Sequence, residues 1–560
     1  MLSLNKLKKV DTPLRYTGGE ARQYIKNVSC VSLRACVISP AMYEIGTFDM
    51  EVKALYYILN SRKDTWCERC FAPLQDFEKL LKEENEKLYT LESKTPLKNM
   101  DVIIFSVSSE MMYTNILNML ELGGIPIFKD KRKEGFPLVI ATGSAVLNPK
   151  PLETFVDMFV MGEISIEVNE IFDIIKENKY NTKDEILKSL SELPGMYIPQ
   201  VTTGNVYMLK ELDIDSEVVP INFALPSIKT MIDKPLVMLS KGCDKSCVNC
   251  THKYIYGKPE YLSVDKAVTK TKKIVAATGD TKIILGSNCF GNYPGFPDII
   301  YKLQDLNRPK IKDISLMEVK LNKDNLWVLK YMKDTEPVSI IVGAPTSELR
   351  EKIGIGINED DTIFLARKIF EAGFSKIRLK YIIGIPTETY EDLSKILNLA
   401  NKICKIYKEY FVKAPDKYIV ELNIYNFKPK PHTPSQWCAV NSAENFEIKA
   451  RYLKDKNRNE NVCITCEEGK QSVVETILSR GDEKVSDLIY EAYKQGARND
   501  MIEPMFMWDA WQIAINKWGI DVKDYLSEYN DKIVLPWDNI CVLTPKEELR
   551  RIYINKIKGD

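Results

Sequence analysis

Three cysteines near the middle of the sequence have a spacing that suits metal binding. Cys243, Cys247 and Cys250 form the pattern C-x3-C-x2-C within eight residues, in the segment "LSKGCDKSCVNCTHKYIYGK". Three thiolates can hold three irons of a four-iron, four-sulfur (4Fe–4S) cluster. The fourth iron then stays open to a ligand from outside the protein. An open coordination site is what distinguishes a reactive metal centre from a structural one.

Two other interpretations of this segment are open. A structural zinc ion could use the three cysteines together with His252, or the three thiols could bind no metal. A structural zinc usually holds together a small, loop-rich module. Here the cysteines directly follow a buried strand, residues 235–240, that begins a longer alternation of strands and helices. We therefore favour the iron–sulfur cluster.

The segments around the cysteines alternate between apolar strands and amphipathic helices. Six strand candidates occur in about 200 residues, at 235–240, 281–287, 313–320, 338–344, 376–384 and 418–427. This alternation predicts a partial (βα)6 barrel of the TIM type over residues 234–443, with its chemistry at the C-terminal ends of the strands. Residues 444–560 predict a mainly helical accessory domain. Its tryptophans need a core to bury them: Trp508, Trp511, Trp518 and Trp537.

The N-terminal region shows a second alternation of the same kind. Residues 32–39, 100–108, 137–142 and 157–162 have the apolar character of buried parallel strands, and residues 50–62 and 114–124 that of helices. We expect a doubly wound, Rossmann-like α/β domain over residues 1–180, followed by a connector over 181–233. The chain as a whole is then α/β.

The composition excludes several classes of protein. Lysine plus arginine equals aspartate plus glutamate at 78 each, which argues against a generally basic nucleic-acid binder. No apolar run has the length of a signal peptide or a membrane span, so we expect a cytoplasmic protein with no membrane partner. The 13 cysteines favour thiols and metal ligands over a disulfide framework, and two histidines are too few for a histidine-rich zinc hydrolase.

Several smaller features have an interpretation of their own. The pairs Cys67-x-x-Cys70 and Cys463-x-x-Cys466 could be a second metal site or a redox pair, but we favour structural thiols. Charged residues occur within two of the barrel strands, at Lys380 and Glu421, and we expect both in a polar barrel lumen. His432 lies between prolines after the sixth strand, where a hydrogen-bonded loop anchor is favoured over a proton-transfer group.

At these positions the sequence resembles the radical S-adenosylmethionine (radical SAM) superfamily. Besides the cysteines after the first barrel strand, "ILGSN" ends the second strand and "YIIGIPTET" ends the fifth. The resemblance implies a 4Fe–4S cluster, SAM, and a reductant such as flavodoxin or ferredoxin as partner. It also implies that Gly286, Ser287 and Asn288 bind the amino group of SAM, and that Ile385 packs against its adenine.

Longer motifs narrow the resemblance. The segments "PLRYTGGE", "YEIG", "CERCFAP", "NPKPL", "KPHTPSQW", "LSRGD" and "LPWDNI" are similar to uncharacterised radical SAM proteins with an N-terminal cobalamin-binding-type domain. The resemblance implies a cobalamin pocket lined by Tyr43, Gly46, Ser106, Ser108, Thr142 and Gly143. No histidine precedes His252, so the domain has no imidazole for cobalt. The alternative is a degenerate domain kept for packing.

Three functions follow from these observations. The main hypothesis is a radical SAM enzyme which, if cobalamin binds, methylates an unactivated carbon or a phosphinate. The second is a radical SAM enzyme without cobalamin that catalyses a rearrangement, a sulfur insertion or the modification of a macromolecule. The third is a non-catalytic protein with a structural or regulatory iron–sulfur cluster. The sequence does not identify the substrate.

Overall fold

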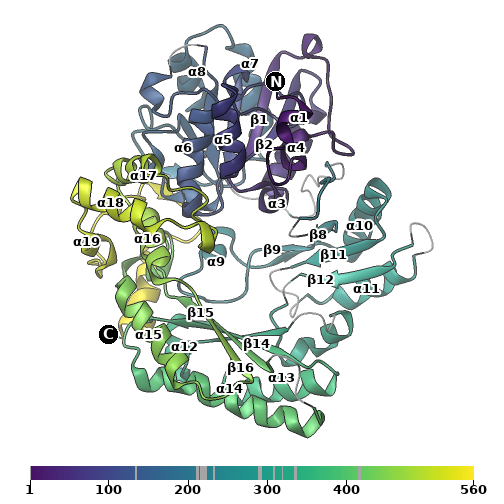
Figure 1. The fold of residues 1–560 in the computed structure, drawn as a ribbon, viewed down its shortest axis with the longest axis vertical. Coiled ribbons are helices and arrows are strands. Elements are labelled where there is room, and N and C mark those ends of the chain that lie inside the picture. Colours follow the sequence, from purple (N-terminus) through teal and green to yellow (C-terminus); the bar gives the residue numbers. More distant parts are fainter. Residues whose placement is uncertain are drawn as a thin grey trace. The chain divides into compact units, whose positions relative to one another are not determined.

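The chain forms two compact units in the computed structural model, which describes residues 2–132, 135–209, 214, 224–230, 232, 234–287, 293–306, 310–317, 319–332, 337–413 and 418–559 (Figure 1). Unit 1 comprises Met1–Asp233, Leu478–Asp521 and Leu535–Val542. Unit 2 comprises Lys234–Ile477, Val522–Val534 and Leu543–Asp560. Residues 444–560, for which we expect an accessory domain, contribute to both units. No helix in the described ranges is long and apolar enough to cross a membrane.

Unit 1 is built on a six-stranded sheet in the order β2-β1-β3-β4-β5-β6. Its strands are parallel except β6, which is antiparallel to β5. The strand order reverses between β1 and β3, and this reversal is where doubly wound proteins bind ligands. The strands are β1 (Leu33–Ser39), β2 (Thr65–Phe71), β3 (Val102–Ser106), β4 (Leu138–Thr142), β5 (Met158–Val160) and β6 (Met196–Tyr197). The expected doubly wound domain is therefore confirmed.

Helices connect the strands of unit 1, and the C-terminal part of the chain adds two more. Asp49 caps the N-terminus of α4 by accepting hydrogen bonds from the backbone N–H groups of Glu51 and Val52. The helices are α1 (Leu4–Leu7), α2 (Leu14–Thr17), α3 (Tyr43–Gly46), α4 (Met50–Ser61), α5 (Gln75–Glu83), α6 (Tyr113–Leu122), α7 (Val168–Glu177), α8 (Lys183–Leu190), α17 (Val485–Lys494) and α18 (Trp508–Trp518). A short parallel pair joins β7 (Val206–Tyr207) to β17 (Ile540–Cys541).

The edge strand β2 of unit 1 was missing from the sequence prediction. β2 carries Glu68 and Arg69 in its centre, so its sequence lacks the apolar run that identified its neighbours. Both side chains are nevertheless buried, with exposed fractions of 0% and 6%. Their charges are compensated inside the unit by ion pairs, which the sequence pattern does not show.

Unit 2 contains all six strands expected for the barrel, distributed over two larger parallel sheets. One has the order β12-β11-β8 and the other β13-β14-β15-β16. Among the described residues no ladder joins β12 to β13. The strands are β8 (Leu236–Met238), β11 (Lys282–Gly286), β12 (Asp313–Leu316), β13 (Val338–Gly343), β14 (Ile377–Ile383), β15 (Val420–Asn426) and β16 (Val462–Cys466). A separate antiparallel pair joins β9 (Ser240–Lys241) to β10 (Glu260–Tyr261).

The helices of unit 2 follow the strands as expected, with one difference. Between β12 and β13 the helix is a 3-10 helix, Lys323–Tyr331, with a kink at Asn325. Asn358 and Thr389 cap α13 and α14 with their side chains. The helices are α9 (Thr251–Tyr256), α10 (Val264–Thr278), α11 (Phe296–Gln304), α12 (Ser347–Ile353), α13 (Glu359–Glu371), α14 (Tyr390–Tyr410), α15 (Ala443–Lys456), α16 (Gly469–Arg480), α19 (Val522–Leu526) and α20 (Lys546–Ile552).

Candidate functional site

The loop that carries the three cysteines is fixed by backbone hydrogen bonds to three other parts of unit 2. We call residues 242–250 the cysteine loop. Cys243 N–H donates to the carbonyl oxygen of Gly257 at 3.1 Å, just after α9. Val248 N–H donates to the carbonyl oxygen of Ile353 at 3.0 Å, and its own carbonyl accepts from Ser435 N–H at 3.0 Å. Backbone bonds of this kind hold the loop in one conformation before any ligand binds.

Two glycines allow the close approach of chain segments around the cysteine loop. Gly354 ends α12 in the left-handed region, with φ of +62°, and a Cβ there would overlap the carbonyl oxygen of Ser246. Gly242 has φ of +70°, and a Cβ there would overlap the carbonyl oxygen of Lys258. Side chains are excluded at both positions by conformation and by space. The loop therefore packs against α12 and against the segment after α9 so closely that a Cβ would not fit at either glycine.

The three thiols are a donor set that fits a cluster. All three are free of disulfides; Cys243 is buried, Cys247 is half-buried and Cys250 is exposed. Burial and the neighbouring thiols of Cys250 and Cys243 raise the pKa of Cys247 to about 11, so the three sulfurs are close enough to interact electrostatically. Among the described residues, no three Cys, His, Asp or Glu side chains lie close enough together to hold a single metal ion. In a 4Fe–4S cluster each cysteine binds a different iron, so the three sulfurs need not meet at a single metal ion.

The zinc alternative receives no support from His252. Its ring packs edge-on against Tyr256 with 4.8 Å between ring centroids, and burial and the charge of Lys320 lower its pKa. Zinc needs four ligands at about 2.0–2.3 Å from a single ion. Within the ranges that the structure describes, His252 and the cysteines do not form such a group.

Two of the residues predicted to bind SAM lie beside residues 239–240, which shortly precede the cysteine loop. Gly286 ends β11, and its carbonyl oxygen accepts a hydrogen bond from Leu239 N–H at 2.8 Å. The next residue, Ser287, is buried, and its hydroxyl lies 2.6 Å from that of Ser240 in β9. Asn288, the third predicted residue, lies outside the described residues. The placement of these residues is consistent with one site at the ends of β9 and β11.

Ile385 lies in the loop that follows β14, and a buried carboxylate holds this loop. Glu388 accepts hydrogen bonds from Gly384 N–H at 2.9 Å and from Lys449 Nζ at 2.6 Å. Asn441 Nδ2 donates to the carbonyl oxygen of Gly384 at 2.9 Å. Ile385 itself is 2% exposed. The loop backbone is therefore fixed at the strand end, with the Ile385 side chain covered by the protein.

The segment after β15, residues 427–437, is bound to α16 by a group of ion pairs. Lys430 contacts Glu475 at 2.7 Å, and Lys428 contacts Glu475 at 2.8 Å and also Glu467. Burial opposes the charge of Glu475, yet the two lysines lower its pKa to about 2. His432 is buried with φ of +57°, and its backbone N–H donates to Gln436 Oε1 at 3.2 Å. The backbone at His432 is therefore fixed within this segment, while the role of its imidazole stays a prediction.

In unit 1, a residue that the sequence analysis did not single out brings two predicted pocket residues together. Glu51, in the first turn of α4, accepts hydrogen bonds from Ser106 Oγ at 2.9 Å and Thr142 Oγ1 at 3.0 Å. Burial and the Asp49 carboxyl raise the pKa of Glu51 to about 8, so its protonated form dominates at neutral pH. A protonated carboxyl group thus lies at the carboxyl ends of β3 and β4.

The other residues predicted for a cobalamin pocket have protein partners. Tyr43 is buried and donates a hydrogen bond to Glu20. Gly46 faces the ring of Phe71, and a Cβ there would lie 2.5 Å from it. Gly143 has φ of +109° and lies against the backbone of Val107. The Ser108 hydroxyl lies 3.9 Å from the sulfur of Met112. Of the six residues predicted for the pocket, Ser106 and Thr142 are the two that bond to the same group, the Glu51 carboxyl.

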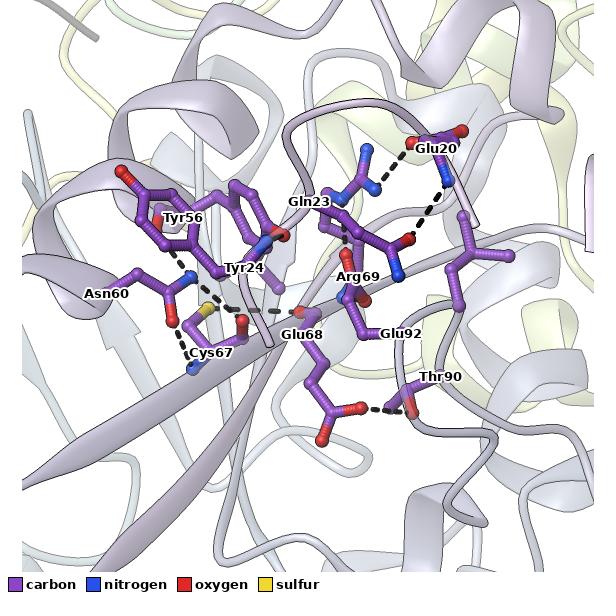
Figure 2. Close-up of polar contacts among 12 residues, drawn as sticks. Glu20, Gln23, Tyr24, Tyr56, Asn60, Cys67, Glu68, Arg69, Thr90 and Glu92 are labelled. Carbon is purple, nitrogen blue, oxygen red and sulfur yellow. Dashed lines mark hydrogen bonds and ion pairs between the residues drawn. The ribbon is translucent and has the colours of Figure 1, made fainter. Parts of the chain in front are cut away.

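The "CERC" segment of β2 forms part of a buried charge network, which Figure 2 shows. Arg69 contacts Glu20 at 2.5 Å and Glu92 at 2.8 Å, and its guanidinium lies 4.8 Å from the centroid of the Tyr56 ring. Glu68 pairs with Arg34 and accepts a hydrogen bond from Thr90 Oγ1 at 2.7 Å. The network balances the buried charges of β2.

The thiols on either side of this network are buried as well. Cys67 and Cys70 have exposed fractions of 0% and 2%, and burial raises the pKa of both thiols. Residues three apart in a strand point to opposite faces of the sheet, so the two thiols do not converge on one ligand. The interpretation of this pair as structural thiols is therefore supported by the geometry.

Comparisons with known protein families place two domain types in the chain. Residues 51–199 match the family described as "Radical SAM proteins, N-terminal", and residues 237–400 match the "Radical SAM superfamily". The second match contains the cysteine loop, β11 with Gly286, and the loop with Ile385. The first lies within unit 1.

Individual relatives are distant. An uncharacterised protein of Methanocaldococcus jannaschii is 27% identical over 418 residues, which are 72% of this chain and 82% of that protein. The threonylcarbamoyladenosine tRNA methylthiotransferase of Aquifex aeolicus is 23% identical over 337 residues, 57% of this chain and 75% of the enzyme. Among solved structures, a radical SAM methyltransferase from Kitasatospora setae with bound cobalamin and [4Fe-4S] cluster has a TM-score of 0.47 at 11% identity, covering 74% of this chain and 78% of that one.

Proposed function

Because this chain belongs to the radical SAM superfamily, we propose that it cleaves SAM reductively and uses the radical so formed on a substrate. The observation that carries the proposal is the cysteine loop, which three backbone hydrogen bonds fix beside the ends of β9 and β11. Cys243, Cys247 and Cys250 would hold the 4Fe–4S cluster that the superfamily uses. The chemistry that the bound cluster would supply is one-electron cleavage of SAM to methionine and a 5′-deoxyadenosyl radical.

The chain's own residues would position SAM for this cleavage. Ser287 and the backbone at Gly286 offer hydrogen-bonding groups for the polar amino-acid part of SAM. The adenine would pack against the loop of Ile385, which Glu388 and Lys449 hold in place. Preorganised groups of this kind lower the entropic cost of binding and orient the sulfonium for reaction. The electron would come from a small redox protein such as a flavodoxin or ferredoxin.

The proposal is tested by anaerobic purification followed by iron analysis and incubation with SAM and dithionite. We expect about four irons per chain and formation of 5′-deoxyadenosine. The triple variant Cys243→Ala, Cys247→Ala, Cys250→Ala should lose both, whereas Cys404→Ala, a buried helical thiol, should keep both. Iron bound without any SAM cleavage by the wild type would instead favour the non-catalytic iron–sulfur protein.

We further propose that unit 1 binds cobalamin and that the enzyme catalyses cobalamin-dependent methylation. This proposal is supported by the doubly wound sheet, whose strand order reverses between β1 and β3, and by the polar group of Ser106, Thr142 and Glu51 at the ends of β3 and β4. Any cobalamin bound there would lack a protein imidazole on cobalt. Growth with cobalamin followed by anaerobic purification should give a protein with corrinoid absorbance. Cleavage of SAM by a protein without that absorbance would favour the radical SAM enzyme without cobalamin.

A further inference from the structure

The sheet β13-β14-β15-β16 has one covered face and one open face. Along β14 and β15 every second residue is buried, whereas the residues between them are half-buried or exposed. Figure 1 shows α13 and α14 on one side of this sheet, which accounts for the buried set. Since side chains alternate along a strand, Lys380 and Glu421 point to the other side, which we call the open face, as the prediction of a polar lumen requires.

The first row of the open face, nearest the amino ends of the strands, is closed by an ion pair. Arg378 is aligned with Glu421, which lies 3.0 Å from its Nε and 2.9 Å from its Nη2. Glu421 also accepts a hydrogen bond from the Tyr418 hydroxyl at 3.3 Å. The charges of this row are satisfied within the sheet, so the row needs no ligand.

The next two rows towards the carboxyl ends differ in character. The first of them is polar, because it aligns Lys380 with Asn423 and Asn423 with Thr465. The second is apolar, and it aligns Ile382 with Tyr425. Aligned residues on neighbouring strands lie about 4.8 Å apart, and successive rows of one face lie about 7 Å apart. One small ligand can therefore contact both rows.

The polar row contains a hydrogen-bond acceptor that is not used. Asn423 Oδ1 is buried and has no hydrogen bond in the described part of the chain. Leaving such an oxygen unsatisfied destabilises the folded chain. The residue as a whole is half-buried, and the terminal torsion of an asparagine side chain has a broad preference, so a turn of the amide brings the oxygen to the open side. A ligand that carries a hydrogen-bond donor would satisfy it.

The apolar row offers the face of a ring to the same ligand. Tyr425 follows Asn423 by two residues on β15, so the two side chains lie on the same face. Tyr425 is 40% exposed, and Ile382 beside it is half-buried. Aromatic side chains with an exposed face bind planar rings by stacking. Ile382 is three residues before Ile385, so this row adjoins the loop that we propose for the adenine of SAM.

We propose that the open face binds the substrate, and that this substrate carries a planar ring with an N–H or O–H donor. The ring would stack on Tyr425 beside Ile382, and its donor would bond to Asn423 Oδ1. Thr465, on the other side of Asn423, would supply a second hydrogen-bonding group. The ring would then lie at the carboxyl ends of the strands, where barrel enzymes carry out their chemistry. This inference rests on the proposed function and specifies its substrate class.

The test is the binding of matched pairs of small aromatic compounds to the purified full-length protein, measured by saturation-transfer NMR titration. In each pair one compound carries the donor and the other carries methyl groups in its place. The pairs are phenol with anisole, and aniline with N,N-dimethylaniline. We expect the wild type to bind the donor compound of at least one pair about five-fold more tightly, which is the effect of one net hydrogen bond.

Two variants and a control assign this binding to the open face. Asn423→Leu removes the acceptor, so it should bind both members of the pair equally tightly. Tyr425→Leu removes the ring, so it should weaken the binding of both members at least about two-fold and keep the preference between them. Tyr301→Leu, which removes a 71% exposed tyrosine of α11, should leave both affinities unchanged.

Two results would overturn the inference. One is a wild type that favours the donor compound in neither pair, and the other is an Asn423→Leu variant that keeps the preference. If Asn423→Leu does not fold, Tyr425→Leu decides, because unchanged affinities in that variant exclude the open face. Cleavage of SAM is measured on the same preparations. A wild type that cleaves SAM but shows no preference refutes this inference alone, and one that shows the preference without cleaving SAM refutes the proposed function alone.

Discussion

The backbone N–H of Ser435 donates to the carbonyl oxygen of Val248 across 3.0 Å and so joins the "KPHTPSQW" segment to the cysteine loop. The two residues are 187 positions apart in the sequence. Lys428 and Lys430, a few residues before Ser435, are bound to Glu475 of α16. Thr433 lies between them: its hydroxyl donates to the Lys430 carbonyl oxygen at 2.7 Å and lies 3.0 Å from the Ser435 hydroxyl. A chain of polar contacts therefore runs from α16 to the centre of the cysteine loop.

Replacing Gly354 should reduce iron binding by displacing the cysteine loop. Alanine at this position would overlap the Ser246 carbonyl and also adopt a left-handed conformation that costs about 1–2 kcal/mol. We expect Gly354→Ala to bind less than half of the iron of the wild type, measured after anaerobic reconstitution. Gly279→Ala is the matched control, because Gly279 also ends a helix at positive φ but a Cβ there meets no atom within 4 Å. Equal iron contents in the two variants would contradict the prediction.

Removing Glu475 should destabilise unit 2 and loosen the segment that holds the cysteine loop. Glu475→Ala leaves Lys428 and Lys430 with less compensating charge; these pairs are half-buried, so the cost should lie between about 1 kcal/mol, as for an exposed pair, and about 5 kcal/mol, as for a fully buried one. Because the folded pKa of about 2 lies below the usual 4.5, this stabilisation is complete above about pH 4.5 and is lost as the pH falls towards 2. Urea unfolding at pH 7 measures the loss, with the exposed Glu460→Gln as control. A change below 1 kcal/mol would refute the estimate.

The elements that carry the site were predictable because their signals are local. Each of the six barrel strands shows as a short apolar run or as an alternation of apolar and polar residues, and Cys243, Cys247 and Cys250 follow the first of them within a few residues. β2 was missed because Glu68 and Arg69 interrupt its apolar pattern, and their partners come from other parts of the chain. A pattern of residue types reports burial but does not show which distant charge compensates a buried one.

Long-range contacts of the site were not predictable for a related reason. Glu51 reads in the sequence as an ordinary acidic residue in the first turn of a helix. Its role comes from Ser106 and Thr142, which are 55 and 91 residues away. Similarly, nothing near Gly354 indicates that Ser246 lies against it. The sequence could place candidate residues at strand ends, but which of them share a partner depends on how the strands are ordered in the sheet.

Arg69 should be essential for the stability of unit 1. Arg69→Met would leave Glu20 and Glu92 buried without their cation, which should cost about 3–5 kcal/mol. Arg69→Lys keeps the charge but can no longer bind two carboxylates with a planar group, so an intermediate loss is expected. Chemical unfolding of the three proteins gives the values. Lys79→Met, which removes an exposed helical pair with Glu83, should cost no more than about 1 kcal/mol, and a similar loss in Arg69→Met would contradict the prediction.

Glu51 should make the stability of unit 1 depend on pH between about 4.5 and 8. Its folded pKa of about 8 lies above the usual 4.5, so in this window the unfolded chain releases a proton that the folded chain retains. The stabilisation is thus fully present below pH 4.5 and is lost as the pH rises through 8. Glu51→Gln has no such proton and should be more stable than the wild type at pH 9. The shift sets an upper bound of about 5 kcal/mol on this gain.

The measurement for Glu51 is the difference in unfolding free energy between variant and wild type at several pH values. We expect this difference to grow in favour of Glu51→Gln from about pH 5 to about pH 8, because in this range the unfolded wild type releases a proton that the folded wild type must retain. Glu170→Gln, at an exposed position in the first turn of α7, should show no such trend. A constant difference across this range would show that Glu51 is already ionised at neutral pH and would remove the protonated carboxyl from the ends of β3 and β4.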